Sequence, residues 1–352
     1  MRLKRKLAYM AFGGLVAWMG LLLLNTVSRT SAQSDEGKLV FTIRKPMPNR
    51  DGFKAMTNQL ERGRGTAKWW EFYQHDICTM NPDGTDFHQL THDGLSRRPR
   101  WSPDGLWMAY ISGVDNAESL YVMQENGEEK RELIKDQFRI HEFWWSPKSH
   151  AILVALEFDR PTNPMENWSV TIDGESRKRR QMSKWAEGWY HWDVEGEDVK
   201  EPRNRLLEAL PDNVSWPKWS PDRKYIAFVA DGVLALADVD VTSATGSWFL
   251  QQNEPPCQQI EEWSHDGKRI LFYVADEICV ATVDKGQFKA FVNLSLFKGR
   301  DATWNPDSSR IAFVGRDQGG RRTSEIYIMD AYTGEMKQIT HTNSDHFDLH
   351  WR

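Results

Sequence analysis

The chain has 352 residues and a formal net charge of −5, with 45 lysines and arginines against 50 aspartates and glutamates. Residues 1–32 hold five of the basic residues and none of the acidic ones, so the remaining chain carries a net charge of −10. This balance argues against a nucleic-acid partner and against binding to an anionic membrane surface through bulk charge. The three cysteines, Cys78, Cys257 and Cys279, lack the spacing of a zinc site, and we expect them to be buried, small apolar side chains.

The first 32 residues have the pattern of a targeting segment. Basic residues within positions 2–6 precede an uncharged, mostly apolar run over residues 7–24, and small residues surround Ala32. The pattern predicts a cleaved export signal with a mature N-terminus near Gln33. The apolar run is also about long enough to cross a bilayer, so an uncleaved N-terminal anchor over residues 7–24 is the alternative. In both cases we expect the rest of the chain to be exported, to the periplasm or the extracellular space.

A tight-turn motif organises the remaining chain. The sequence Trp101-Ser102-Pro103-Asp104-Gly105 is followed by an alternating apolar run over residues 106–111. Proline presets φ at the second turn position, the aspartate can accept bonds from its own backbone, and glycine relieves the exit from the turn. The sequence therefore predicts a β-hairpin corner at this point.

This corner recurs along the chain. The equivalent tryptophans are Trp145, Trp219, Trp263, Trp304 and, cut off by the end of the chain, Trp351, and the successive spacings are 44, 74, 44, 41 and 47 residues. A period in the low forties, with four short strands in each period, is typical of propeller blades.

Between the corners, a second pattern repeats as a strand, a glycine turn and a further strand. It is clearest at residues 76–84, 119–127 and 325–334. With these motifs the chain resembles the TolB-like β-propeller repeat family, whose blades read W-S-P-D-G, I-A-F, I-Y-V-M-D, a glycine turn and R-L-T. The resemblance covers about residues 38–352 and implies an all-β, six-bladed β-propeller. TolB carries an N-terminal α/β domain before its propeller, which we do not expect in this chain.

The two ends of the chain are expected to close the ring together. Residues 38–43 have the character of the second strand of a blade, and residues 347–351 supply its missing first strand. A closing blade shared between the termini leaves no open strand edges. We expect tryptophan-containing insertions at about 44–75 and 185–213, and a charged outer edge strand at 176–180.

Two functions from different classes are compatible with the sequence. Hydrolases with similar propellers need a G-x-S-x-G nucleophile elbow, which this chain does not contain. We therefore expect a non-catalytic, monomeric, exported propeller that binds a protein or peptide partner at one mouth of its central channel, without a cofactor. The alternative is a carbohydrate-active propeller, either a sugar binder or a polysaccharide lyase assisted by a divalent metal in the channel.

The residues just before each corner tryptophan begin the innermost strands and should gather around one mouth of the channel. They differ in charge and type, which a shared packing role would not favour, and concave sites with convergent polar groups usually bind ligands. We predict a binding site formed by Arg98, His141, Glu142, Trp216, Glu261, Asp301, His346 and Asp348, with Trp189 of the second insertion at its rim. The alternative is a water-filled funnel of solvated side chains.

Three polar residues of the last strand are candidate metal ligands. His346, Asp348 and His350 alternate along the sequence, which would place them on one face of an innermost strand. Two imidazoles and a carboxylate suit a divalent metal. The alternative for these positions is hydrogen bonding between blades.

Overall fold

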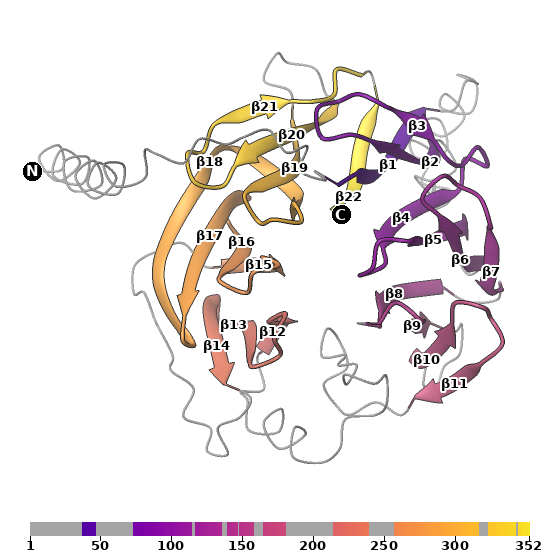
Figure 1. Cartoon of the computed structure of the whole chain (residues 1–352), viewed down its shortest axis with the longest axis horizontal. Coiled ribbons are helices and arrows are strands. Elements are labelled where there is room, and N and C mark those ends of the chain that lie inside the picture. Colours follow the sequence, from indigo (N-terminus) through magenta and orange to yellow (C-terminus); the bar gives the residue numbers. More distant parts are fainter. Residues whose placement is uncertain are drawn as a thin grey trace, which may run out of the picture. The chain divides into compact units, whose positions relative to one another are not determined.

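The computed structural model describes residues 37–46, 73–114, 117–135, 139–146, 148–157, 165–180, 214–238, 257–316, 323–342 and 344–352. These residues contain 22 β-strands and no helix, and therefore no helix of the length and hydrophobicity that a membrane crossing needs. The strands form six antiparallel blades around a common centre (Figure 1). The predicted all-β, six-bladed β-propeller is confirmed, and it occupies the unit Gly37–Arg352.

The first blade is built from both ends of the chain. Its strand order from the centre outward is β22 (Asp345–Trp351), β1 (Leu39–Pro46), β2 (Tyr73–Met80) and β3 (His88–Gln89). Beyond the paired strands, Lys38 N–H donates to the Arg352 carbonyl at 2.9 Å, and Arg352 N–H donates to the Lys38 carbonyl at 3.1 Å. The closing blade shared between the termini is therefore confirmed.

The second and third blades have four strands each. Blade 2 consists of β4 (Ser96–Trp101), β5 (Trp107–Val114), β6 (Ala117–Gln124) and β7 (Arg131–Ile134). Blade 3 consists of β8 (Arg139–Trp145), β9 (Ala151–Glu157), β10 (Met165–Thr171) and β11 (Arg177–Arg180). Strand β11 is the outermost strand of its blade, as expected for the basic stretch at 176–180.

The described part of blade 4 has three strands, and blades 5 and 6 share one long strand. Blade 4 consists of β12 (Val214–Trp219), β13 (Tyr225–Ala230) and β14 (Val233–Asp238). Blades 5 and 6 consist of β15 (Cys257–Trp263), β16 (Arg269–Val274), β17 (Glu277–Asp284), β18 (Gln287–Trp304), β19 (Arg310–Arg316), β20 (Ser324–Asp330) and β21 (Met336–Gln338). Strand β18 pairs with β17 through residues 287–293 and Lys298 and with β19 through residues 299–304, so it is outermost in blade 5 and innermost in blade 6.

The repeated turn is held by its own side chains. In the corner after Trp101, the Ser102 hydroxyl donates to Asp104 at 2.6 Å, Leu106 N–H donates to Asp104 at 3.0 Å, and Trp107 N–H donates to Ser102 Oγ at 3.0 Å. The corners after Trp219, Trp263 and Trp304 repeat these bonds. Local side-chain bonds of this kind fix a turn without help from distant parts of the chain.

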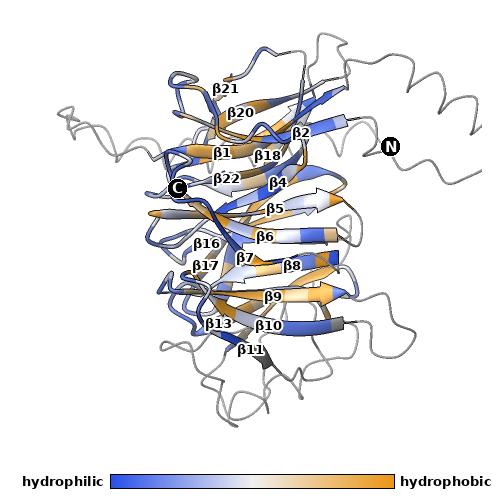
Figure 2. Ribbon diagram, turned by 90° about the vertical axis from the view of Figure 1, so that its right-hand side faces the viewer, coloured by the Kyte–Doolittle hydropathy of each residue, from blue (hydrophilic) through white to orange (hydrophobic). Residues whose placement is uncertain are grey.

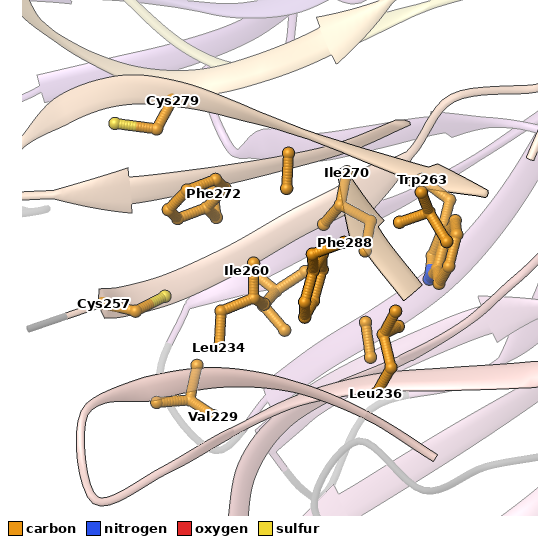
Figure 3. Close-up of a cluster of buried hydrophobic side chains, with 13 residues drawn as sticks. Val229, Leu234, Leu236, Cys257, Ile260, Trp263, Ile270, Phe272, Cys279 and Phe288 are labelled. Carbon is orange, nitrogen blue, oxygen red and sulfur yellow. The ribbon is translucent and has the colours of Figure 1, made fainter. Parts of the chain in front are cut away.

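The hydrophobic core lies between the blades. Figure 2 shows hydrophobic residues concentrated along strands such as β1 and β9 and hydrophilic residues at the turns and in β11. One cluster joins blades 4 and 5 through side chains including Val229, Leu236, Ile260 and Phe272 (Figure 3). Similar clusters join blades 2 and 3, 6 and 1, 5 and 6, and 1 and 2. Because each sheet packs on both faces, its middle strands are apolar at successive positions, as in the run Ile226–Val229.

The corner tryptophans of four blades pack toward the preceding blade. Trp101 lies in the cluster between blades 1 and 2, Trp263 in the one between blades 4 and 5, Trp304 in the one between blades 5 and 6, and Trp351 in the one between blades 6 and 1. The tryptophan is thus both the end of an innermost strand and the contact that joins consecutive blades.

The remaining sequence expectations concern the cysteines and the insertions. All three cysteines are buried and none forms a disulfide within the described residues, and burial raises the pKa of Cys78 and Cys257 to about 12. Strand β1 reaches Pro46 and β2 begins at Tyr73, so both ends of the insertion expected at 44–75 are strand. The rest of that insertion, the insertion at 185–213, and residues 1–32 lie outside the described residues.

Deletion of residues 346–352 is expected to lower the melting temperature sharply. The deletion removes most of β22, leaves β1 without its inner partner, and takes the buried Leu349 and Trp351 out of the core. The point variant Trp351→Ala should lower the free energy of unfolding by about 3–5 kcal/mol, because it leaves a large cavity in the core. The matched variant Tyr332→Ala, at a side chain 73% exposed, should change little. Thermal and urea unfolding measure both, and an unchanged melting curve for the deletion would contradict the shared blade.

Candidate functional site

A bulge recurs in the innermost strands, three residues before the corner tryptophan. Arg98, Trp216, Asp301 and Asp348 occupy this place and have φ values of 55°, 53°, 51° and 53°. The pairing register shifts beside each of them. A bulge of this kind bends the strand and changes the direction in which the following side chains point. We call the third residue before each corner tryptophan the bulge position; its members are Arg98, Glu142, Trp216, Ile260, Asp301 and Asp348.

Side chains at the bulge position connect consecutive blades. Asp348 N–H donates to Asp301 Oδ2 at 3.1 Å, which links blade 6 to blade 1. Arg98 N–H donates to Asp348 Oδ2 at 3.0 Å, which links blade 1 to blade 2. The Arg98 guanidinium then reaches blade 3, where it pairs with Glu142 at 2.5 Å and donates to the His141 carbonyl at 2.9 Å. A continuous polar chain therefore runs across four blades.

The residues immediately before five of the six corner tryptophans make a second set of links. His350 Nδ1 lies 3.4 Å from the Trp101 N–H, Thr303 Oγ1 lies 3.4 Å from the Trp351 N–H, and Glu262 accepts the Trp304 N–H. At Arg100 and Lys218 the link differs. Their backbone carbonyls accept the indole N–H of Trp145 at 3.0 Å and of Trp263 at 2.9 Å.

Charged side chains from all six blades interact electrostatically at the centre of the ring. We call this set the axial cluster; its members are Arg100, Glu142, Lys218, Glu261, Glu262, Asp301 and Asp348. The Arg100 side chain is accessible to solvent, but protein atoms surround it closely enough to remove part of its hydration. Burial lowers the pKa of Arg100, but carboxylates from four other blades outweigh this effect and raise it.

Two adjacent carboxyl groups of the axial cluster have strongly shifted pKa values. Loss of hydration raises the pKa of Glu261 to about 7, with Lys218 opposing the shift and Asp301 adding to it. Loss of hydration also raises the pKa of Glu262 to about 7, opposed by the hydrogen bond from Trp304 N–H. These two groups therefore change charge near neutral pH.

The structure brings together most of the predicted binding residues. Arg98, Glu142, Asp301 and Asp348 are linked by direct contacts, and Glu261 lies within their electrostatic field. Trp216 takes the bulge position of blade 4, with 48% of its surface exposed. His141 is exposed and contributes its carbonyl to Arg98, while Trp189 lies outside the described residues.

His346 does not take part in this arrangement. Its side chain is completely buried, with Nδ1 2.5 Å from the Ser324 carbonyl and the ring 5.4 Å from the ring of Phe41. Phe41 belongs to the cluster of Leu349 and Trp351, so His346 faces the core between blades 6 and 1. The prediction that His346 lies at the mouth of the channel therefore differs from the observed geometry.

The candidate metal ligands are not brought onto one face. The bulge at Asp348 breaks the alternation on which that expectation rested, and each residue serves a different contact. Asp348 accepts bonds from Arg98 N–H and from the Thr42 hydroxyl at 2.9 Å, and His350 lies against the Trp101 N–H. Burial lowers the pKa of His346, and lowers that of His350 to about 3. Within the described ranges, no three His, Cys, Asp or Glu side chains are grouped as a metal site.

Sequence reasoning missed Arg100, Lys218 and Glu262. A signal for them existed, because each is the residue directly before a corner tryptophan. Alternation assigns that position to the side of the strand opposite its tryptophan neighbour, but the bulge decides where the side chain finally points.

A pocket of about 770 Å³ lies away from the predicted mouth, between blades 1 and 2. Leu90, Leu106 and Trp107 line it together with polar side chains that include Lys38 and Glu125. Lys38 pairs with Glu125 at 3.3 Å, so part of the polar lining is engaged within the protein.

Glu261→Gln is expected to stabilise the protein at high pH. The folded state keeps the Glu261 proton up to about pH 7, whereas the unfolded chain loses it near 4.5, so ionisation destabilises the folded state as the pH rises through this window. At about pH 8 the variant should exceed the wild type by about 1–3 kcal/mol in urea unfolding, and at about pH 5 the difference should shrink. Glu128→Gln, on an exposed turn, is the control. Parallel pH profiles for wild type and Glu261→Gln would contradict the shift.

No family model matches the chain. In sequence, it is 30% identical over 147 residues to the uncharacterized peptidase YuxL of Bacillus subtilis (strain 168), which covers 39% of this chain and 22% of that protein. The chain thus aligns with about a fifth of the length of this relative.

Solved structures resemble the chain over most of its length. TolB from Acinetobacter baumannii matches with a TM-score of 0.54 and 14% identity, over 90% of this chain and 66% of TolB. Acylaminoacyl peptidase from Pyrococcus horikoshii matches with a TM-score of 0.57 and 14% identity, over 87% of this chain and 51% of the peptidase. Oligogalacturonate lyase from Vibrio parahaemolyticus matches with a TM-score of 0.53 and 12% identity, over 73% of this chain and 85% of the lyase. At these identities the likeness is one of fold, and the fold is the β-propeller of TolB and of peptidase propeller domains.

Proposed function

We propose that this protein is a non-catalytic propeller that binds a protein or peptide partner at the centre of its ring. The observation that carries the proposal is Trp216, an indole 48% exposed at a bulge position whose equivalents in four of the other five blades are charged. Exposed tryptophan beside arginine and carboxylates is typical of the residues that dominate protein interfaces.

The backbone at Trp216 supports a role beyond packing. Its φ of 53° is the left-handed region, which costs a bulky residue about 1–2 kcal/mol and which glycine adopts freely. Its side chain also remains half exposed, so burial does not offset this cost in full. An aromatic residue kept in a strained and exposed place fits selection for recognition.

A carbohydrate ligand is the second candidate, and the same residue supports it. An exposed indole can stack on the apolar face of a sugar ring as well as on a peptide. The oligogalacturonate lyase among the structures of similar fold makes this candidate worth testing. The two candidate functions are distinguished by whether the protein captures a polypeptide or a glycan.

Trp216→Gly is expected to abolish partner capture without harming the fold. Glycine relieves the strained φ, so the melting temperature should stay the same or rise slightly, while the exposed indole is lost. Pull-downs from the extracytoplasmic fraction of the native cells, followed by mass spectrometry of proteins and glycan analysis, measure the effect. The control is Tyr332→Ser, which removes an aromatic ring 73% exposed on the turn after β20. Equal capture by wild type and Trp216→Gly would contradict the proposed site.

We propose further that the propeller is exported, on the evidence of the basic start and apolar run of residues 1–32. Intact-mass measurement of the mature protein should give an N-terminus near Gln33. A chain with intact Met1 in the membrane fraction would instead support the anchor over residues 7–24. An intact chain in the cytoplasm would contradict export in both forms.

A further inference from the structure

In the axial cluster, the carboxylates accept hydrogen bonds from the protein, whereas two of the cationic side chains donate none to the described residues. Every carboxylate already accepts a bond from the protein: Glu142 from Arg98, Glu261 from Gln259, Glu262 from Trp304, Asp301 from Asp348 and Asp348 from Arg98. These bonds are also the links between or within blades. The carboxylates are therefore explained by the construction of the ring.

The two cations Arg100 and Lys218 differ from the carboxylates in this respect. Neither guanidinium nor ammonium makes a hydrogen bond or ion pair with any residue that the structure describes. Their backbones are nevertheless fixed, because each carbonyl accepts the indole N–H of the next corner tryptophan. Rigid strands thus present two unused cationic donors toward the same carboxyl groups, Glu142, Glu261 and Glu262.

We propose, building on the proposed function, that the partner supplies a carboxylate that binds Arg100 and Lys218 at the centre of the ring. A guanidinium offers a planar fork that matches both oxygens of a carboxylate, and an ammonium adds a point charge with three donors. Trp216 lies two residues before Lys218 on β12 and offers an aromatic surface to the same ligand. The carboxylate belongs either to an aspartate or glutamate side chain or to a free C-terminus.

The negative charge already present at the centre does not prevent this binding. Glu142 is neutralised by its ion pair with Arg98. Glu261 and Glu262, which face Lys218, Arg100, Asp301 and Tyr273, have pKa values of about 7 and take up protons when a further negative charge approaches. Binding of a carboxylate is therefore coupled to proton uptake, and the affinity falls as the pH rises from about 6 to about 8. A cationic ligand would show the opposite dependence.

The test uses the full exported chain and four pentapeptides, three of them blocked at both ends, with binding followed by ligand-observed NMR and calorimetry. One peptide carries a single glutamate between glycines, the second carries glutamine there, the third carries lysine, and the fourth is acetylated pentaglycine with a free C-terminal carboxylate. At about pH 6 we expect the glutamate or the C-terminal carboxylate peptide to bind about tenfold more tightly than the glutamine peptide. Comparing the glutamate peptide with the peptide that has a free C-terminal carboxylate identifies the source of the carboxylate.

Variants locate the effect. Arg100→Gln combined with Lys218→Gln should remove the preference for a carboxylate, whereas Lys148→Gln, an exposed lysine on the turn after Trp145, should leave it unchanged. Measurement at about pH 6 keeps Glu261 and Glu262 protonated, so the loss of two counter-charges is not expected to unfold the protein. Arg100→Lys retains the charge without the fork and should keep part of the preference.

The inference is overturned if wild type binds the glutamine or lysine peptide as tightly as both carboxylate peptides, or if its affinity rises with pH. It is also overturned if the double variant keeps the full preference. These outcomes are separate from those of the proposed function. Capture that is lost with Trp216→Gly but unaffected by the double variant would retain the partner site and remove the carboxylate from it.

Discussion

The packing of corner tryptophans against the preceding blade, seen at four of the six corners, is the interaction on which the ring depends. Trp101, Trp263, Trp304 and Trp351 each lie in a cluster shared by two blades, at the end of an innermost strand. A single four-stranded sheet has two apolar faces and cannot cover either by itself, so it is stable only between neighbours. Closure by β22 is thus a requirement of packing, since without it blades 6 and 1 would both expose an apolar face.

Each innermost strand lines the centre of the ring, and at four corners the tryptophan at its end packs against the preceding blade. The strand must therefore change direction before this tryptophan, and the bulge provides the change. The extra residue turns the strand just before its tryptophan, which leaves an unpaired backbone N–H at the bulge. Asp301 and Asp348 accept such N–H groups from the next blade, and Thr42 adds a donor to Asp348. The carboxylates of Asp301 and Asp348 at the centre thus serve the construction of the blades.

The fold was predictable because its signals are local. The turns after Trp101, Trp219, Trp263 and Trp304 are held by side chains within five residues, and the alternating runs that follow are long enough to identify strands. The site was less predictable because the bulge leaves no comparable signal. Left-handed backbone is usually marked by glycine, yet here Arg98, Trp216, Asp301 and Asp348 adopt it. Simple alternation therefore misplaced His346 and passed over Arg100 and Lys218.

The residue before the corner tryptophan can link two blades either through its side chain or through its backbone carbonyl. The second kind of link leaves the side chain out of the contact between blades. Where that residue is an acceptor, as at Glu262, Thr303 and His350, its side chain lies against the backbone N–H of the next tryptophan. A cation cannot accept this bond, and after Arg100 and Lys218 the next tryptophan donates its indole N–H to the backbone carbonyl instead. The indole nitrogens of Trp101 and Trp304, whose backbone N–H groups are already engaged, have no hydrogen-bond partner among the described residues. One link between blades is thus exchanged for another, and the exchange leaves two cationic side chains at the centre of the ring without a hydrogen bond or ion pair to the residues that the structure describes.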